Sequence, residues 1–241
     1  MDGIQIDFHS HVLPGIDDGS KDAEMSAQML KMLYNQGIRH SVLTPHFYGR
    51  RHSPDDFYNI RQKSYEKLME VYDPECMPCI HLGAEIAINE RSVDWDISKL
   101  KINGTDIVLL EMPDEYGDWV ESVFYEYKRL GYQIMIAHLD RVIEMYRGDR
   151  YRRIMSDTDF IYQINNDSLS SHKVKKILAN ADREGMNFVL GSDAHNLKTR
   201  IPDFDTVDKF LQKGTLSKGF CKNVIKTQNL IANRYWNNIV I

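Results

Sequence analysis

Short apolar runs recur along the chain, separated by longer segments in which apolar residues return every three or four positions. Each run is five to seven residues long and most are rich in β-branched or aromatic residues, which is typical of buried strands. The seven runs occupy residues 4–8, 40–44, 80–86, 106–112, 133–137, 160–165 and 187–191. Strands that alternate with helical segments in this way predict βαβ units built on a parallel sheet.

The segments between the runs carry helix caps and helix breakers. The first helix is expected to take Ser20 as its N-cap, to stop at Gly37, and to place four residues toward the core: Met25, Met29, Leu30 and Leu33. Further helices are expected over residues 54–72, 119–130, 141–155, 172–184, 203–212 and 217–234. No linker or repeat divides the chain, so one α/β domain is expected over residues 1–241. The pattern fits either a closed barrel or a doubly wound sheet.

Composition narrows the class of partner. The formal net charge is -5 and the sequence pI is near 6.0, which gives no general attraction to nucleic acid or to an anionic membrane. No apolar run approaches the roughly 20 residues that span a bilayer, and no leader peptide is evident, so we expect a cytoplasmic protein without membrane insertion.

The three cysteines include the pair Cys76-Met-Pro-Cys79. A redox pair of this spacing would open a helix, whereas a strand-like run follows here. A structural zinc would need two more ligands, and the chain has no second such pair. We therefore interpret these residues and Cys221 as ordinary reduced cysteines.

Imidazoles and carboxylates collect at the ends of the predicted strands. The carboxyl ends of parallel strands meet at one edge of the fold, where active sites form. Residues of this kind at or just past a strand end are His9, His11, His46, Glu85, Glu111, His138, Asp193 and His195, and the sixth run ends in the amide Asn165. Burying so many charged groups without compensation would be costly, so bound cations are expected.

The spacing supports shared ions. His9 and His11 are two residues apart and point to the same face of a strand, and so would Asp193 and His195 in extended backbone. Mixed imidazole and carboxylate ligation suits manganese, iron or zinc better than calcium. Paired divalent ions activate water and stabilise phosphoryl displacement, so a polynuclear phosphate-hydrolysing site is the leading hypothesis.

Two arginines follow the candidate ligands closely. Arg141 comes three residues after His138, and Arg200 comes five residues after His195. A guanidinium group matches the oxygens of phosphate. A solvated surface position is the alternative for each.

The candidate residues lie in short motifs. They are, in chain order, His-Ser-His, Asp-Asp-Gly, Thr-Pro-His, Gly-Ala-Glu and Gly-Ser-Asp-Ala-His-Asn. In these ordered motifs the chain resembles the PHP (polymerase and histidinol phosphatase) superfamily. More narrowly, the chain is similar to the manganese-dependent protein-tyrosine phosphatases that bacteria encode with capsule and exopolysaccharide genes. The resemblance implies a distorted (β/α)7 barrel with up to three divalent ions, manganese first and iron or zinc as alternatives.

By position, the resemblance implies a role for each site residue. One ion would be held by His9, His11, Glu85 and Asp193; Glu85 would bridge to a second held by Glu111 and His138; and Asp18, His46 and His195 would hold the third. Arg141 and Arg200 match the phosphate-binding arginines of the family. Asp17 receives no role. The chain departs from the family pattern at Leu139, Asp140 and Asp167.

The implied activity is hydrolysis of phosphotyrosine on a protein by in-line attack of a metal-activated hydroxide. The implied substrate is the tyrosine-rich tail of a membrane-associated autokinase that regulates polysaccharide synthesis, and a homo-oligomer is compatible with the resemblance. Phe47, Tyr48 and Tyr116 would either form an aromatic rim for the phosphotyrosine ring or pack in loops. Two alternatives stay open: a phosphomonoesterase for a small molecule such as histidinol phosphate, and a non-catalytic metal-binding module.

Overall fold

The computed structural model describes residues 3–146, 154–155, 157–181, 185–213 and 216–236. All seven predicted strand runs form strands, and every strand pair is parallel. The strands are β1 (Ile6–Ser10), β2 (His40–Leu43), β3 (His46–Phe47), β4 (Cys79–Leu82), β5 (Glu85–Ala87), β6 (Ile107–Glu111), β7 (Gln133–Ile136), β8 (Ile161–Asn165) and β9 (Asn187–Gly191). The predicted parallel α/β architecture is confirmed.

Two of the predicted runs differ from the observed strands. The second run ends with β2, and a short strand that was not predicted, β3, begins after Pro45, which has no backbone N–H to donate to a ladder. The third run breaks between β4 and β5 at Gly83, where a Cβ atom would lie 3.3 Å from Thr44 and from Ile102. The ladders therefore divide into a three-stranded sheet, β1-β2-β4, and a six-stranded sheet, β3-β5-β6-β7-β8-β9.

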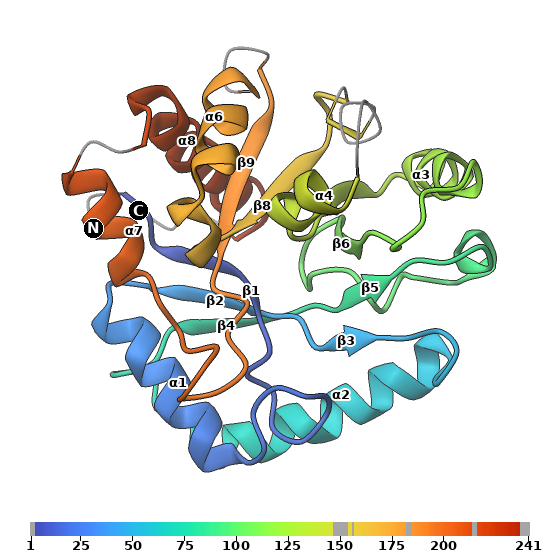
Figure 1. The fold of residues 1–241 in the computed structure, drawn as a ribbon. Helices are drawn as coiled ribbons and strands as arrows, with labels where there is room; N and C mark the ends of the chain where they lie inside the picture. Colours follow the sequence, from blue (N-terminus) through green and yellow to red (C-terminus); the bar gives the residue numbers. More distant parts are fainter. Residues whose placement is uncertain (1–2, 147–153, 156, 182–184, 214–215, 237–241) are drawn as a thin grey trace.

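The two sheets meet where β1 and β9 end. Ser10 and Ala194 form a parallel bridge, the N–H of His11 donates to the carbonyl of Ala194 at 2.9 Å, and the N–H of Asp193 donates to that of His9 at 2.8 Å. The seven runs thus follow one another in chain order around a distorted barrel (Figure 1), rather than forming a doubly wound sheet.

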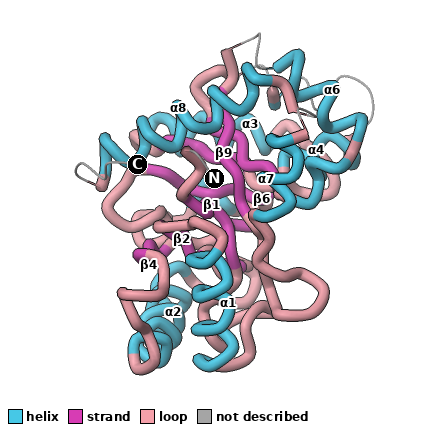
Figure 2. Tube along the Cα trace, turned by 90° about the vertical axis from the view of Figure 1, so that its left-hand side faces the viewer, coloured by secondary structure: helices cyan, strands magenta, loops and turns pink. Residues whose placement is uncertain are grey.

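The core has two parts. Alternate residues of the strands, among them Phe8, Val42, Leu109 and Met135, form an apolar cluster of their own. A larger cluster lies between the strands and the helices. Figure 2 shows the strands gathered centrally, with α1 (Ala23–Asn35) and α2 (Pro54–Met69) below them and α8 (Lys218–Tyr235) above.

The first helix begins later than predicted. Asp22, not Ser20, is the N-cap of α1, because its extended backbone lets the carboxylate accept the N–H of Met25 at 2.8 Å. The hydroxyl of Ser20 instead donates to the carbonyl of Asp22. Gly37 ends the segment as predicted, with a φ of +90° that favours glycine.

The remaining helices agree with prediction except at their ends. They are α2, capped by Ser53, α3 (Trp119–Arg129), α4 (Leu139–Met145), α6 (His172–Ala181), α7 (Asp205–Gln212) and α8, capped by Ser217, with short 3-10 helices over Ser92–Asp94 and Asp167–Ser170. Most of the predicted extension of α4 beyond residue 146, and the end of the helix predicted to reach residue 184, lie outside the described residues. Within the described part of the chain, no helix is both long and apolar enough to cross a membrane.

Candidate metal centre

The carboxyl ends of the strands bring all nine predicted ligands into one group of side chains. His9 is on β1 and His11 follows it, His46 begins β3, Glu85 begins β5 and Glu111 ends β6. The remaining ligands lie in the turns after β1, β7 and β9: Asp18, His138, Asp193 and His195. Their ligand atoms form overlapping sets in which every member lies within 4.8 Å of the others.

Glu85 occupies the middle of the group and is fully buried. Its Oε2 lies 3.2 Å from the Nε2 atoms of both His9 and His11 and 2.9 Å from Nδ1 of His46. Its Oε1 lies 2.5 Å from Nε2 of His138. The two oxygens of one carboxylate therefore face different imidazoles, as required of a residue that bridges two ions.

Asp193 completes the first predicted set, with Oδ1 at 3.8 Å from Nε2 of His9 and 3.5 Å from that of His11. Both members of the second predicted set lie beside Glu85. Glu111 groups with Glu85 and His46, and His138 groups with Glu85 and His9.

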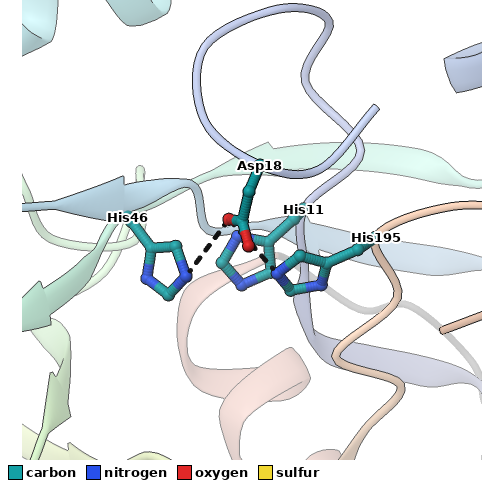
Figure 3. A group of neighbouring side chains, drawn as sticks. All are labelled: His11, Asp18, His46 and His195. Carbon is teal, nitrogen blue, oxygen red and sulfur yellow. Dashed lines mark ion pairs between the residues drawn. The ribbon is translucent and has the colours of Figure 1, made fainter. Parts of the chain in front are cut away.

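The third predicted set, Asp18, His46 and His195, lies together with His11 (Figure 3). Asp18 Oδ1 lies 3.5 Å from Nε2 of His46 and 3.6 Å from Nε2 of His195. The Asp18 side chain is 66% exposed, whereas that of His195 is 2% exposed. Asp18 therefore lies at the solvent side of the centre and His195 at its buried side.

Several ligand atoms in the centre are buried without a hydrogen-bond partner among the described residues: His46 Nδ1, Glu85 Oε2, Asp193 Oδ1 and His195 Nε2. Buried polar atoms are normally satisfied, so several such atoms at one place indicate a site suited to a cation. Imidazole nitrogens and carboxylate oxygens are suitable donors for manganese, iron or zinc. The residues present therefore fit a cluster of divalent ions.

Neighbouring imidazoles keep the carboxylates of Glu85 and Asp193 ionised. Burial alone would raise the pKa of Glu85, but the imidazoles of His9 and His138 hold it well below its usual range. Burial is likewise overcome at Asp193, whose pKa is lowered by His11 and His9. Burial, assisted by His11, lowers the pKa of His195 to about 4. The Nε2 atom of His195 is thus free to bind a cation at neutral pH.

Two of the candidate ligands have strained backbones. His138 has a φ of +47° and Asp193 a φ of +50°, the left-handed region that non-glycine residues rarely adopt. They are the positive-φ residues other than glycine in the described part of the chain. Such strain costs free energy and tends to persist at functional sites.

Asp17, which received no role from the sequence, orients two ligands. Its Oδ2 accepts a hydrogen bond from Nδ1 of His11 at 2.7 Å and from the backbone N–H of His46 at 3.0 Å. Burial alone would raise the pKa of Asp17, but His11 lowers it to about 2. With Nδ1 protonated, Nε2 of His11 faces the centre as a lone-pair donor.

Two amide side chains on β8, Gln163 and Asn165, form hydrogen bonds with the ligands His9, His138 and Asp193. Gln163 Oε1 accepts from Nδ1 of His9 at 3.0 Å and from the N–H of His138 at 2.9 Å. Asn165 Oδ1 lies 3.2 Å from Nδ1 of His138, and its amide donates to Asp193 at 3.0 Å. The sequence singled out Asn165 as a strand-end residue and missed Gln163, whose position two residues earlier on the same face was the available signal.

Both predicted arginines reach the centre. The Nη2 atoms of Arg141 and Arg200 each lie 2.6 Å from Oδ2 of Asp193. Their side chains are 46% and 38% exposed, so each joins the centre to solvent. Two guanidinium groups that converge on one point beside a set of metal ligands form a suitable site for phosphate.

The departures from the family pattern have structural roles. Leu139 is buried in the core, and Asp140 accepts the N–H of Asn165 at 3.1 Å. Burial raises the pKa of Asp140. Asp167 begins a short 3-10 helix and is exposed.

The expected aromatic rim is only partly present. Phe47 is fully buried against Phe57 and Trp95, so it cannot contact a substrate. Tyr48 stacks on His46 with ring centroids 5.2 Å apart. Tyr48 also lines an open cleft of about 1100 Å³ that continues to Arg51 and Trp119.

The fold and the centre together define a parallel α/β protein that gathers a cluster of candidate metal ligands at the carboxyl ends of its strands. The chain belongs to the CpsB/CapC family of capsular polysaccharide synthesis, whose model matches residues 5–230. Membership of this family confirms the resemblance found in the sequence.

Named relatives share most of their length with this chain. It is 31% identical over 208 residues to tyrosine-protein phosphatase YwqE of Bacillus subtilis (strain 168), covering 81% of this chain and 79% of the relative. It is 26% identical over 215 residues to tyrosine-protein phosphatase CpsB of Streptococcus pneumoniae, covering 82% and 85%.

Solved structures share the fold. One, described as part of the crystal structures of YwqE from Bacillus subtilis and CpsB from Streptococcus pneumoniae, unique metal-dependent tyrosine phosphatases, superposes with a TM-score of 0.70 at 24% identity, covering 91% of each chain. A histidinol phosphate phosphatase from Lactococcus lactis superposes with a TM-score of 0.53 at 18% identity, covering 88% of this chain and 94% of the other. These likenesses support the barrel.

Proposed function

We propose that this protein is a metal-dependent phosphotyrosine-protein phosphatase. The observation that carries the proposal is the convergence of nine metal ligands and two arginines at one end of the barrel. Its relatives over most of the chain are named tyrosine-protein phosphatases, which directs the choice among phosphate esters.

In the proposal, the nine candidate ligands would hold up to three divalent ions. Their nitrogen and oxygen donors fit manganese, iron or zinc, and the family resemblance favours manganese among these. When bound, such ions would activate water for attack at neutral pH and stabilise negative charge on the leaving oxygen. Glu85 would be a ligand shared within the centre, and Asp17 and Gln163 fix the tautomers of His11 and His9.

Arg141 and Arg200 bind the substrate phosphate. In the protein without substrate both point at Oδ2 of Asp193. A phosphate dianion carries more negative charge than the Asp193 carboxylate and therefore attracts both guanidinium groups. In binding it, the two arginines orient the ester for in-line displacement of the tyrosine phenolate. Water supplies the new oxygen on phosphorus, and its protons are shared between phosphate and the released tyrosine.

No cysteine takes part in the proposed reaction. Cys79 begins β4, at the opposite end of the strands from Glu85. Cys76 and Cys221 form no disulfide among the described residues, and neither belongs to the centre. The hydrolysis therefore proceeds without a phosphocysteine intermediate.

We extend the proposal to a partner: the tyrosine-rich tail of an autokinase that regulates capsule or exopolysaccharide synthesis. The cleft beside Tyr48 is open to solvent, and its arginines, Arg50, Arg51 and Arg91, suit an extended phosphorylated segment. Three acidic residues also line it: Glu90, Asp114 and Glu115. A cytoplasmic location, a single domain over residues 1–241 and a homo-oligomeric state complete the proposal. The free cysteines are in keeping with a reducing compartment.

The test compares substrates. The manganese-loaded protein is assayed on a phosphotyrosyl peptide, the matched phosphoseryl peptide and histidinol phosphate. We expect the highest kcat/KM on the phosphotyrosyl peptide. A higher value on histidinol phosphate would overturn the choice of substrate in favour of a small-molecule phosphomonoesterase, and no turnover of any ester would favour a non-catalytic module.

A further inference from the structure

A second group of potential metal ligands lies at the other end of the barrel. His40 begins β2, Cys79 begins β4, and His81 is two residues further along β4. His40 Nδ1 lies 3.1 Å from His81 Nε2, and one ligand atom of each of the three residues lies within 4.8 Å of the others. None of the three belongs to the centre already described.

The strand register explains why these side chains meet. His40 and Cys79 are direct partners in the parallel pairing of β2 with β4, so their side chains point to the same face. His81 points to that face as well, because alternate residues of a strand share a side. The group is therefore fixed by two hydrogen-bonded strands, not by flexible loops.

The donor set and its spacing suit zinc or another thiophilic divalent ion. Two imidazole nitrogens bound to one tetrahedral zinc lie about 3.3 Å apart, since each zinc–nitrogen bond is about 2.05 Å long. The observed separation of 3.1 Å is close to that value. Cys79 is exposed and free, so an ion can reach the group from solvent.

The surroundings favour binding further. The indole of Trp236 stacks on the ring of His81 with centroids 3.7 Å apart and on that of His40 at 5.9 Å, which holds both rings in place.

We propose that His40, Cys79 and His81 form a second metal site, which takes one zinc-like ion with water at the fourth position and joins β2 to β4 at their amino ends. The sequence argument against zinc looked for a second cysteine pair, whereas the structure supplies two histidines instead. Cys76 is not a member, since its thiol donates to Asp73 at 3.2 Å. The site is independent of the proposed phosphatase reaction.

Cobalt(II) is the probe that tests the proposal. The full-length protein is stripped of metal, kept reduced with a phosphine, and titrated with Co²⁺. A thiolate-to-cobalt charge-transfer band in the near ultraviolet reports only a site that contains cysteine. The nine ligands of the main centre include no sulfur, so cobalt bound there gives no such band.

We expect the band in the wild type, its loss in Cys79→Ser, and its retention in the matched controls Cys76→Ser and Cys221→Ser. Zinc should displace the cobalt and remove the band. His81→Gln should weaken cobalt binding at least tenfold, and circular dichroism checks that each variant is folded. Absence of the band in the wild type, or its persistence in Cys79→Ser, would overturn the proposal.

Discussion

At the scale of single residues, the candidate centre depends on side chains that hold ligands as much as on the ligands. The pair Asp17 and Asp18 shows why sequence alone could not divide these roles. Both are carboxylates in one turn, but Asp17 points inward to His11 while Asp18 reaches His46 from the solvent side. Only the backbone path between them decides which oxygen faces the ions. The positions of the ligands were predictable because they lie at strand ends. The residues that hydrogen-bond the ligands, such as Asp17 and Gln163, were not predictable.

Replacing Asp17 with alanine should weaken metal binding. Without its carboxylate, His11 loses the hydrogen bond that fixes its tautomer and ring orientation, so we expect a loss of roughly 10–100-fold in manganese affinity. Manganese dependence of the phosphatase rate measures the effect. Asp118→Ala is the matched control, because Asp118 is exposed and makes no capping hydrogen bond. Equal manganese dependence in Asp17→Ala and the wild type would contradict the assigned role.

Replacing Arg200 with lysine should lower turnover of the phosphotyrosyl peptide. A lysine keeps the charge but lacks the planar fork, and hydrogen bonds to charged groups contribute about 1.5–3 kcal/mol, so kcat/KM should fall roughly 10–100-fold. Arg129→Lys is the control, since Arg129 is exposed and pairs with Glu126. Metal content should stay unchanged in both variants. A wild-type kcat/KM in Arg200→Lys would show that this arginine does not bind phosphate.

At the scale of elements, periodicity located all seven strand runs, but it missed the break at Gly83 and the short strand β3. The break at Gly83 depends on close packing against Thr44 and Ile102, which no local pattern contains, whereas Pro45 is itself a strand breaker in the sequence. Both positions matter for the centre, because β3 and β5 begin in register as His46 opposite Glu85. The cap of α1 moved from Ser20 to Asp22 for a similar reason: Ser20 is held by the carbonyl of His11. Element type was thus predictable, and exact ends were not.

The β2–β4 pair should carry a measurable pH dependence of stability in metal-free protein. Burial, with a smaller effect of His40, lowers the pKa of His81 from 6.5 to about 3. Between these values the unfolded chain binds more protons, so the free energy of unfolding rises with pH, and the contribution is complete above pH 6.5. Acidification below pH 6.5 should cost about 1 kcal/mol per pH unit at this residue.

Urea unfolding of His81→Gln at pH 5 to 7 in the presence of a chelator checks this expectation. The variant should lose stability less steeply on acidification than the wild type. His52→Gln is the control, because His52 is exposed, and its slope should equal that of the wild type. Identical slopes for His81→Gln and the wild type would contradict the role of burial.

At the scale of the whole molecule, the barrel closes at the point where the proposed ions bind. The bridge between Ser10 and Ala194 joins the two sheets directly beside His9, His11 and Asp193. Ions shared by these residues would therefore hold the ends of the chain's first and last strands together. The sequence predicted the ring of strands through the family resemblance. Periodicity alone left a doubly wound sheet as an alternative, because it does not show how β9 returns to β1.

Removal of metal should lower the melting temperature. An ion that binds only the folded chain adds about 2.7 kcal/mol at one hundred times its Kd, which corresponds to roughly 5–10 °C for a domain of this size. Thermal scans with chelator, and then with increasing manganese, measure the effect. An unchanged melting temperature after verified removal of metal would argue against ions in this part of the barrel.

The central claim is that nine ligands at one end of the barrel hold the ions on which hydrolysis depends. The most direct measurement combines elemental analysis with the initial rate on a phosphotyrosyl peptide. It is made as metal-free protein is reloaded with manganese, in the wild type and in His9→Ala/His11→Ala. We predict no turnover without metal, a rate that rises with bound manganese in the wild type, and loss of both bound metal and turnover in the double variant. Turnover that persists in the metal-free protein, or in the double variant, would contradict the account.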